Sequence, residues 1–75
     1  MMLEGVDNKH PSLICVLRIS EIQGFRIRLH FDGYDSCYDF WRNADSTEIY
    51  PVGYCKKNNL NLSLPPGKIY EKFIN

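Results

Sequence analysis

With 75 residues, the chain is long enough for one small domain and too short to enclose a large enzyme cleft. Nine lysines and arginines balance nine aspartates and glutamates, so the chain lacks the basic excess of proteins that bind the phosphate backbone of nucleic acids. No apolar run approaches the roughly 20 residues of a membrane-spanning helix, and no signal peptide is expected. The odd number of scattered cysteines, Cys15, Cys37 and Cys55, fits reduced thiols in the nucleus or cytosol better than a secreted disulfide scaffold.

The first part of the chain predicts two strands. Residues 2–6 are short and partly apolar, which predicts an edge strand, and they lead into a polar loop at residues 7–12. The next run, residues 13–22, is apolar on both faces at first and then alternates. This pattern is typical of a central strand with one end more deeply buried.

The clearest strand pattern lies at residues 25–31. Its apolar positions are Phe25, Ile27, Leu29 and Phe31. They alternate with polar positions, as in a strand with one buried and one solvated face. The pair Asp32-Gly33 predicts a turn, and residues 36–42 then predict a third long strand, antiparallel to the one before it.

The sequence pattern changes after Arg42, from long strands to short elements. Asp45 and Glu48 have the spacing of a capping box, which predicts a helical turn at residues 46–49. Residues 52–57 predict a second short helical turn, and residues 60–64 predict a final strand that closes the sheet. The residue pattern therefore favours an all-β fold, a small, strongly bent five-stranded barrel with short helical turns.

Six motifs, in the family's order and at its spacing, resemble the signatures of a malignant brain tumour (MBT) repeat. They are LEGVD at 3–7, HPSLIC at 10–15, RLHFDGY at 28–34, YDFW at 38–41, IYPVGYC at 49–55 and PPG at 65–67. The resemblance implies a single repeat over residues 1–75, with a barrel core at about 3–67 and a C-terminal extension at 68–75 that could form one or two helical turns.

The resemblance also implies a fold and a cellular context. The fold would be an SH3-like barrel of the Tudor-like Royal superfamily. The chain would be part of a chromatin regulator of the lethal malignant-brain-tumour-like kind, which acts in the nucleus in transcription repression and holds several such repeats in tandem. The combination of His10 and Tyr34 is similar to that at the same positions in the opening repeat of three-repeat proteins.

Binding repeats of this family recognise mono- and dimethylated lysine of histone tails with an aromatic cage and one acid. Carried over by position, the resemblance implies a cage of Phe31, Tyr34 and Tyr38 and an acid at Asp7, with His10 where binders often have asparagine. Ring faces attract a weakly hydrated methylammonium by about 0.5 to 2 kcal/mol each. A carboxylate accepts the N–H that mono- and dimethyl-lysine keep and trimethyl-lysine lacks. Tyr34 stands where strong binders have tryptophan, which predicts weaker attraction of the cation by this ring.

The residue pattern alone leaves simpler interpretations open. Phe31 and Tyr38 fit ordinary core rings, Asp7 fits a loop acid that caps a turn, and His30 should face away from Phe31 as a satisfied histidine. The alternative function is therefore a structural, non-binding repeat. It would pack against sibling repeats in the same chain or mediate another protein–protein interaction.

No catalytic residue, metal site or cofactor is predicted. The sequence has no Cys-x-x-Cys pair for zinc and no glycine-rich phosphate loop. His30, Asp32 and Cys37 include the residue types of a catalytic or metal site, but no nucleophile elbow or oxyanion loop accompanies them. The chain is therefore expected not to be an enzyme, to bind no membrane, and to bind nucleic acid only weakly if at all.

Overall fold

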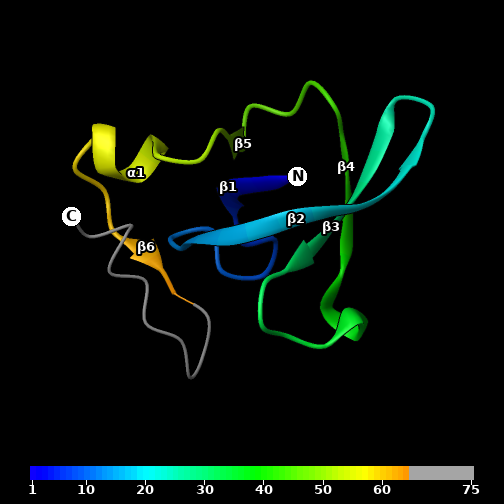
Figure 1. Cartoon of the computed structure of the whole chain (residues 1–75), viewed down its shortest axis with the longest axis horizontal. Helices are drawn as coiled ribbons and strands as arrows, with labels where there is room; N and C mark the ends of the chain where they lie inside the picture. Colours follow the sequence, from blue (N-terminus) through cyan, green and yellow to red (C-terminus); the bar gives the residue numbers. More distant parts are fainter. Residues whose placement is uncertain (65–75) are drawn as a thin grey trace.

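The computed structural model describes residues 1–64; residues 65–75, which include the PPG motif and the predicted helical tail, lie outside the described residues. Its elements are β1 (Met2–Val6), β2 (Ile14–Gln23), β3 (Arg26–Phe31), η1 (Ser36–Tyr38), β4 (Phe40–Asn43), β5 (Ile49–Tyr50), α1 (Tyr54–Lys57) and β6 (Leu62–Ser63). The strands form one curled sheet, which confirms the predicted all-β class (Figure 1). Within residues 1–64, no helix has the length and apolar character needed to cross a membrane.

The long strand β2 organises the sheet, whose order is β4-β3-β2-β1-β5, with β6 paired to β2. Its first half pairs with β1, and its second half pairs with β3 in the hairpin that projects from the sheet (Figure 1). The β2–β3 register shifts between Ile19 and Glu21. Such a bulge bends and twists a strand. The bend allows β2 to pair with β1 along its first half and with β3 along its second half while the sheet curls.

The prediction of an edge strand at residues 2–6 is wrong. The short strand β5 pairs with β1 through Glu4↔Tyr50 and Gly5↔Ile49, so β1 lies inside the sheet. The predicted helical turn at residues 46–49 is also wrong, because this segment leads directly into β5. Instead of a capping box, Ser46 Oγ accepts the backbone N–H of Glu48 at 3.2 Å, and the chain then extends into β5.

The predicted third strand begins later than its sequence pattern indicates. Residues 36–42 were expected to be extended, but Ser36–Tyr38 form the 3-10 turn η1 and β4 starts at Phe40. The reason is local, because the Asp35 carboxylate accepts the backbone N–H of Cys37 at 2.8 Å and so caps η1. The antiparallel pairing of β4 with β3 is confirmed, as are α1 and the last strand, β6, which pairs parallel to β2.

The core lies between the two halves of the sheet. Its cluster of buried side chains is Leu17, Ile27, Leu29, Phe31 and Phe40. Gly5 packs so closely on this cluster that a Cβ atom placed there would stand 2.6 Å from Leu17 Cδ1. This core holds the end of β3, and therefore Phe31, in a fixed position.

Glu4 is the one acidic residue among the described residues that is buried as a whole, backbone included, with 2% of its surface exposed. Its carboxylate accepts the backbone N–H groups of Gly53 at 2.7 Å and Cys55 at 2.8 Å. Burial of an ionised group is tolerated when such charge-assisted hydrogen bonds replace water. Glu4 therefore fastens the start of α1 to β1, a role that the sequence analysis did not predict.

Candidate functional site

A cavity of about 290 Å³ lies where the β1–β2 loop meets the end of β3 and the η1 segment, and we refer to it as the ring-lined cavity. It is lined by Asp7, Asn8, Lys9, His10, Leu13, Cys15, Val16, Phe31, Asp32, Tyr34, Tyr38, Ser63 and Leu64. All five of the predicted site residues are in this lining. The fold thus brings together, in one hollow, residues from three separate parts of the chain.

Three aromatic rings form adjoining walls of the ring-lined cavity. The ring centroids of Phe31 and Tyr34 lie 6.1 Å apart at an interplanar angle of 67°, and those of Tyr34 and Tyr38 lie 6.2 Å apart at 83°. Because successive rings are steeply inclined, they enclose a space rather than forming one stack. Such an arrangement can present several ring surfaces to one cation.

The three rings differ in how firmly the core holds them. Phe31 is 8% exposed and packs on Phe40 at a centroid distance of 5.3 Å, so it is both a core ring and a wall of the cavity. Tyr34 is 48% exposed and Tyr38 is 55% exposed. The interpretation of Tyr38 as an ordinary core ring is therefore wrong.

Hydrogen bonds in the β3–β4 connection shape the segment that carries the two tyrosines. The Tyr34 N–H donates to the Phe31 carbonyl at 3.1 Å, and the Tyr38 N–H donates to the Asp35 carbonyl at 3.2 Å. The bonds from Cys37 to the Asp35 carboxylate stabilise its charged form and lower the pKa of Asp35 below its ordinary value.

Asp7 follows β1 directly and is half-buried. Its Oδ1 accepts the backbone N–H of Lys9 at 2.8 Å and that of His10 at 3.3 Å, so it does cap the loop turn, as the simpler interpretation predicts. The same carboxylate lines the ring-lined cavity. Asp7 thus combines both predicted features: it fixes the loop that carries His10 and places a negative charge beside the rings.

Cys15 and Ser63 supply a part of the lining that the sequence pattern does not indicate. They are register partners in the parallel β2–β6 pair, which also brings Leu64 to the cavity. Burial raises the pKa of the Cys15 thiol, and the negative charge of Asp7 raises it further, against an opposing hydrogen bond with Ser63. Cys15 therefore contributes a neutral thiol to the wall at neutral pH.

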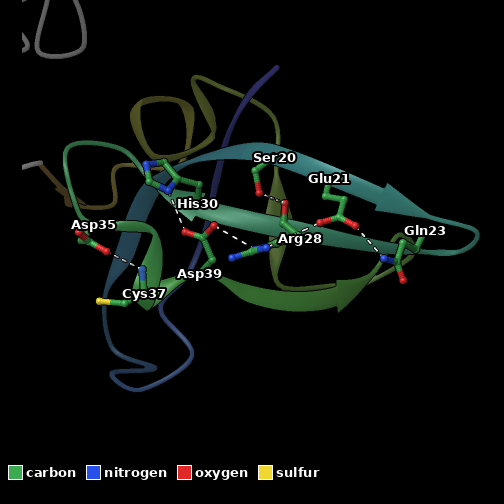
Figure 2. Close-up of polar contacts among 8 residues, drawn as sticks. All are labelled: Ser20, Glu21, Gln23, Arg28, His30, Asp35, Cys37 and Asp39. Atoms are coloured by element: carbon green, nitrogen blue, oxygen red, sulfur yellow. Dashed lines mark hydrogen bonds and ion pairs between the residues drawn. The ribbon is translucent and has the colours of Figure 1, made fainter.

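An ion pair lies outside the cavity lining, on the other face of β3. His30 faces away from Phe31, as predicted, and its Nδ1 lies 2.8 Å from Asp39 Oδ1 (Figure 2). Within residues 1–64, no group of three or more histidine, cysteine, aspartate or glutamate residues could hold a metal ion.

Comparison with known proteins places this chain in a family. A family model described as the mbt repeat matches residues 1–69. The chain is 55% identical over 74 residues to human Lethal(3)malignant brain tumor-like protein 4 and 49% identical over 73 residues to mouse Lethal(3)malignant brain tumor-like protein 1. These alignments cover 99% and 97% of this chain, but only 12% and 9% of the two relatives, so the chain spans a small part of each.

A solved structure has the same fold. It contains the four MBT repeats of Drosophila melanogaster Sfmbt in complex with the peptide RHR(me)KVLR. The match has a TM-score of 0.84 and 41% identity, and it covers 88% of this chain and 15% of that one. The chain therefore belongs to the MBT repeat family, as its six sequence motifs predict.

Proposed function

We propose that this repeat is a chromatin reader module that inserts a mono- or dimethylated lysine side chain into the ring-lined cavity. One observation carries the proposal: three inclined rings and the Asp7 carboxylate line a single open cavity. Its volume of about 290 Å³ is close to the roughly 300 Å³ at which small-molecule sites begin, which suits one inserted side chain. A cavity filled by Tyr34 or His10 would have favoured the non-binding alternative.

The rings and the acid have different tasks in this proposal. Phe31, Tyr34 and Tyr38 stabilise the methylammonium through their π-systems and exclude competing water. Asp7 selects lower methylation states because its carboxylate accepts an N–H that trimethyl-lysine lacks. Unmodified lysine keeps its N–H groups but loses a stronger hydration shell on entry, so it binds less well.

The known relatives support the choice of ligand and partner. The Sfmbt repeats were crystallised with a peptide that contains a methylated lysine, and the relatives include malignant brain tumor-like proteins and the human Polycomb protein SCMH1. In this proposal the partner is a methylated histone tail, and the parent protein acts in the nucleus in transcription repression. Neighbouring MBT repeats in the same chain are the second class of partner.

A second candidate function is architectural. It is favoured by the Asp7 hydrogen bonds, since a carboxylate that already accepts the Lys9 and His10 N–H groups has a structural task without any ligand. A repeat of this kind would keep its loop geometry while packing against sibling repeats. The two candidates differ in one measurable property, which is saturable binding of methylated lysine.

The test is an NMR titration of the chain with mono-, di- and trimethyl-lysine and with unmodified lysine. The proposal expects saturable shift changes at Phe31, Tyr34 and Tyr38, with the lower methylation states bound more tightly than trimethyl-lysine. The decisive variant is Asp7→Asn, because the amide oxygen still accepts the loop N–H groups while the charge is lost. Asp45→Asn is the matched control, since Asp45 is exposed and lines a separate shallow hollow beside Trp41.

Binding that is lost in Asp7→Asn and retained in Asp45→Asn would support the reader function. If no methylated lysine moves the three ring residues at millimolar concentration, the reader function is rejected and the architectural candidate remains. Equal affinity for all four ligands would reject the role given to Asp7.

A further inference from the structure

The backbone ladder between β3 and β4 ends one residue pair before the segment that carries the cavity tyrosines. The ladder runs from Arg26↔Asn43 to Leu29↔Phe40. The next pair in this register is His30 and Asp39, and these two residues are joined through their side chains, Nδ1 to Oδ1 at 2.8 Å. The side-chain pair thus continues the strand pairing by one step, up to the end of η1.

Asp39 is held by two donors from the same strand. Its Oδ2 lies 3.1 Å from Arg28 Nε, and its side chain is only 5% exposed (Figure 2). Because a carboxylate can only accept hydrogen bonds, the Nδ1 of His30 carries a hydrogen in this contact. Arg28 in turn lies 3.7 Å from Glu21 of β2, so the chain of polar contacts reaches across the sheet.

Besides the local hydrogen bonds from Cys37 and Tyr38 to Asp35, the η1 segment is held through Asp39. None of its residues, Ser36 to Tyr38, is buried, so apolar packing does not fix its position. Asp39 is the residue that ends η1, and its N–H donates to the Ser36 carbonyl at 3.0 Å. The Asp39 side chain therefore ties the end of η1 to β3, directly beside Tyr38.

We propose that Asp39, held by His30 and Arg28, is a positioning residue that fixes the Tyr38 wall of the ring-lined cavity. The inference rests on the proposed function, because a fixed ring matters for affinity only where a cation is bound. Binding groups that are not held by hydrogen bonds and packing must be ordered by the ligand, which weakens affinity. The network lies outside the cavity, since Asp39 and His30 are not among its lining residues.

The test compares Asp39→Asn with the control Asp45→Asn, an exposed acid-to-amide change. An asparagine replaces one of the two oxygens that contact His30 and Arg28 with an amide nitrogen, which cannot accept a hydrogen bond, so one of these contacts is lost. Three quantities are measured on each variant: monomethyl-lysine affinity by NMR titration, the free energy of unfolding in urea, and the nuclear Overhauser contacts between the Tyr34 and Tyr38 rings without ligand.

Asp39→Asn is expected to weaken affinity by about fivefold, a change that corresponds to about 1 kcal/mol of binding free energy. The ring-to-ring contacts should weaken at the same time, while Asp45→Asn changes neither. His30→Gln keeps a donor toward Asp39 and should therefore bind better than His30→Leu. These two variants also decide the question if Asp39→Asn does not fold.

The inference is overturned if Asp39→Asn folds and retains both the affinity and the ring-to-ring contacts. It is also overturned if the unfolded fraction of the variant accounts for the whole loss of affinity, since Asp39 would then contribute to folding alone. Absence of binding in the unsubstituted chain would reject the proposed function instead. In that case the ligand-free ring contacts still test whether Asp39 positions Tyr38.

Discussion

The contribution of Tyr34 to cation binding can be measured by changing only its ring. Tyr34→Leu keeps an apolar side chain but removes the π-system, and Tyr34→Trp enlarges that system. The peptide hydrogen bond from the Tyr34 N–H to the Phe31 carbonyl does not depend on the side chain, so it should remain in both variants. The comparison thus isolates the ring from the backbone that carries it.

The exposure of Tyr34 sets the magnitude. Because 48% of its surface is exposed, its cation–π contribution should lie in the range for solvated sites, about 0.5 to 1 kcal/mol. Its loss in Tyr34→Leu corresponds to about a twofold to fivefold weaker affinity. Tyr34→Trp should strengthen binding by about twofold, because the indole has the most favourable ring face for a cation.

The assay is the same titration, repeated with a neutral isostere in which carbon replaces the charged nitrogen of dimethyl-lysine. For the cation, affinity should decrease in the order Trp, Tyr, Leu at position 34, while the neutral isostere should show little dependence on the ring. Phe25→Leu provides the matched control, since Phe25 is an exposed ring in the β2–β3 turn. The reasoning is refuted if the neutral ligand follows the same order, or if Leu binds the cation as well as Tyr.

Three further predictions concern stability, each measured as the free energy of unfolding in urea. Glu4→Gln should lower this free energy by about 2 to 3 kcal/mol, because an amide nitrogen replaces one of the two oxygens that accept the part-buried N–H of Gly53 and the buried N–H of Cys55. The control Glu48→Gln, at an exposed ion pair, should cost less than about 1 kcal/mol. Gly5→Ala should lower the free energy of unfolding by about 1 to 3 kcal/mol, since the added Cβ would stand 2.6 Å from Leu17 Cδ1. An unchanged free energy of unfolding would mean that the Leu17 side chain moves aside without cost. Burial, and then the hydrogen bond and the charge of Glu4, raise the pKa of the Cys55 thiol from 9.0 to about 11. Above pH 9 the unfolded chain therefore releases a proton that the folded chain retains. Stability should therefore fall between pH 9 and about 11, and less steeply in Cys55→Ala; equal slopes would contradict the assignment.

The strands that sequence predicts well are those whose pattern is sustained. Residues 25–31 alternate over seven positions, and β3 forms at Arg26–Phe31 with Ile27, Leu29 and Phe31 inward. The prediction that Phe25 belongs to the buried face is wrong, because it lies in the β2–β3 turn and is 59% exposed. The two-residue strand β5 is too short to show a periodic pattern in the sequence. It is recognised only in the structure, from its pairing with β1. The extended pattern at residues 36–42 fails because the short side chain of Asp35 offers a backbone N–H a nearby acceptor, which favours a turn.

The candidate site was predictable only in part, because its residues are separated along the chain. Asp7, His10 and the three ring residues were identified through family resemblance, and the fold brings them to one cavity. Cys15 and Ser63 were missed because the parallel β2–β6 pairing joins positions 48 residues apart. Glu4 was missed because a single acid in a strand resembles a solvated position, and its hydrogen-bond partners lie 49 and 51 residues later.

The ring-lined cavity combines one fixed wall with two walls that the core does not hold. Phe31 belongs to the buried cluster, so a substitution there should change folding and binding together. Tyr34 and Tyr38 are half-exposed and depend on the hydrogen bonds of the β3–β4 connection, so substitutions there should change binding with little effect on folding. In the proposed function, affinity for a methylated lysine can therefore be gained or lost through changes in one surface segment, while the barrel itself stays intact.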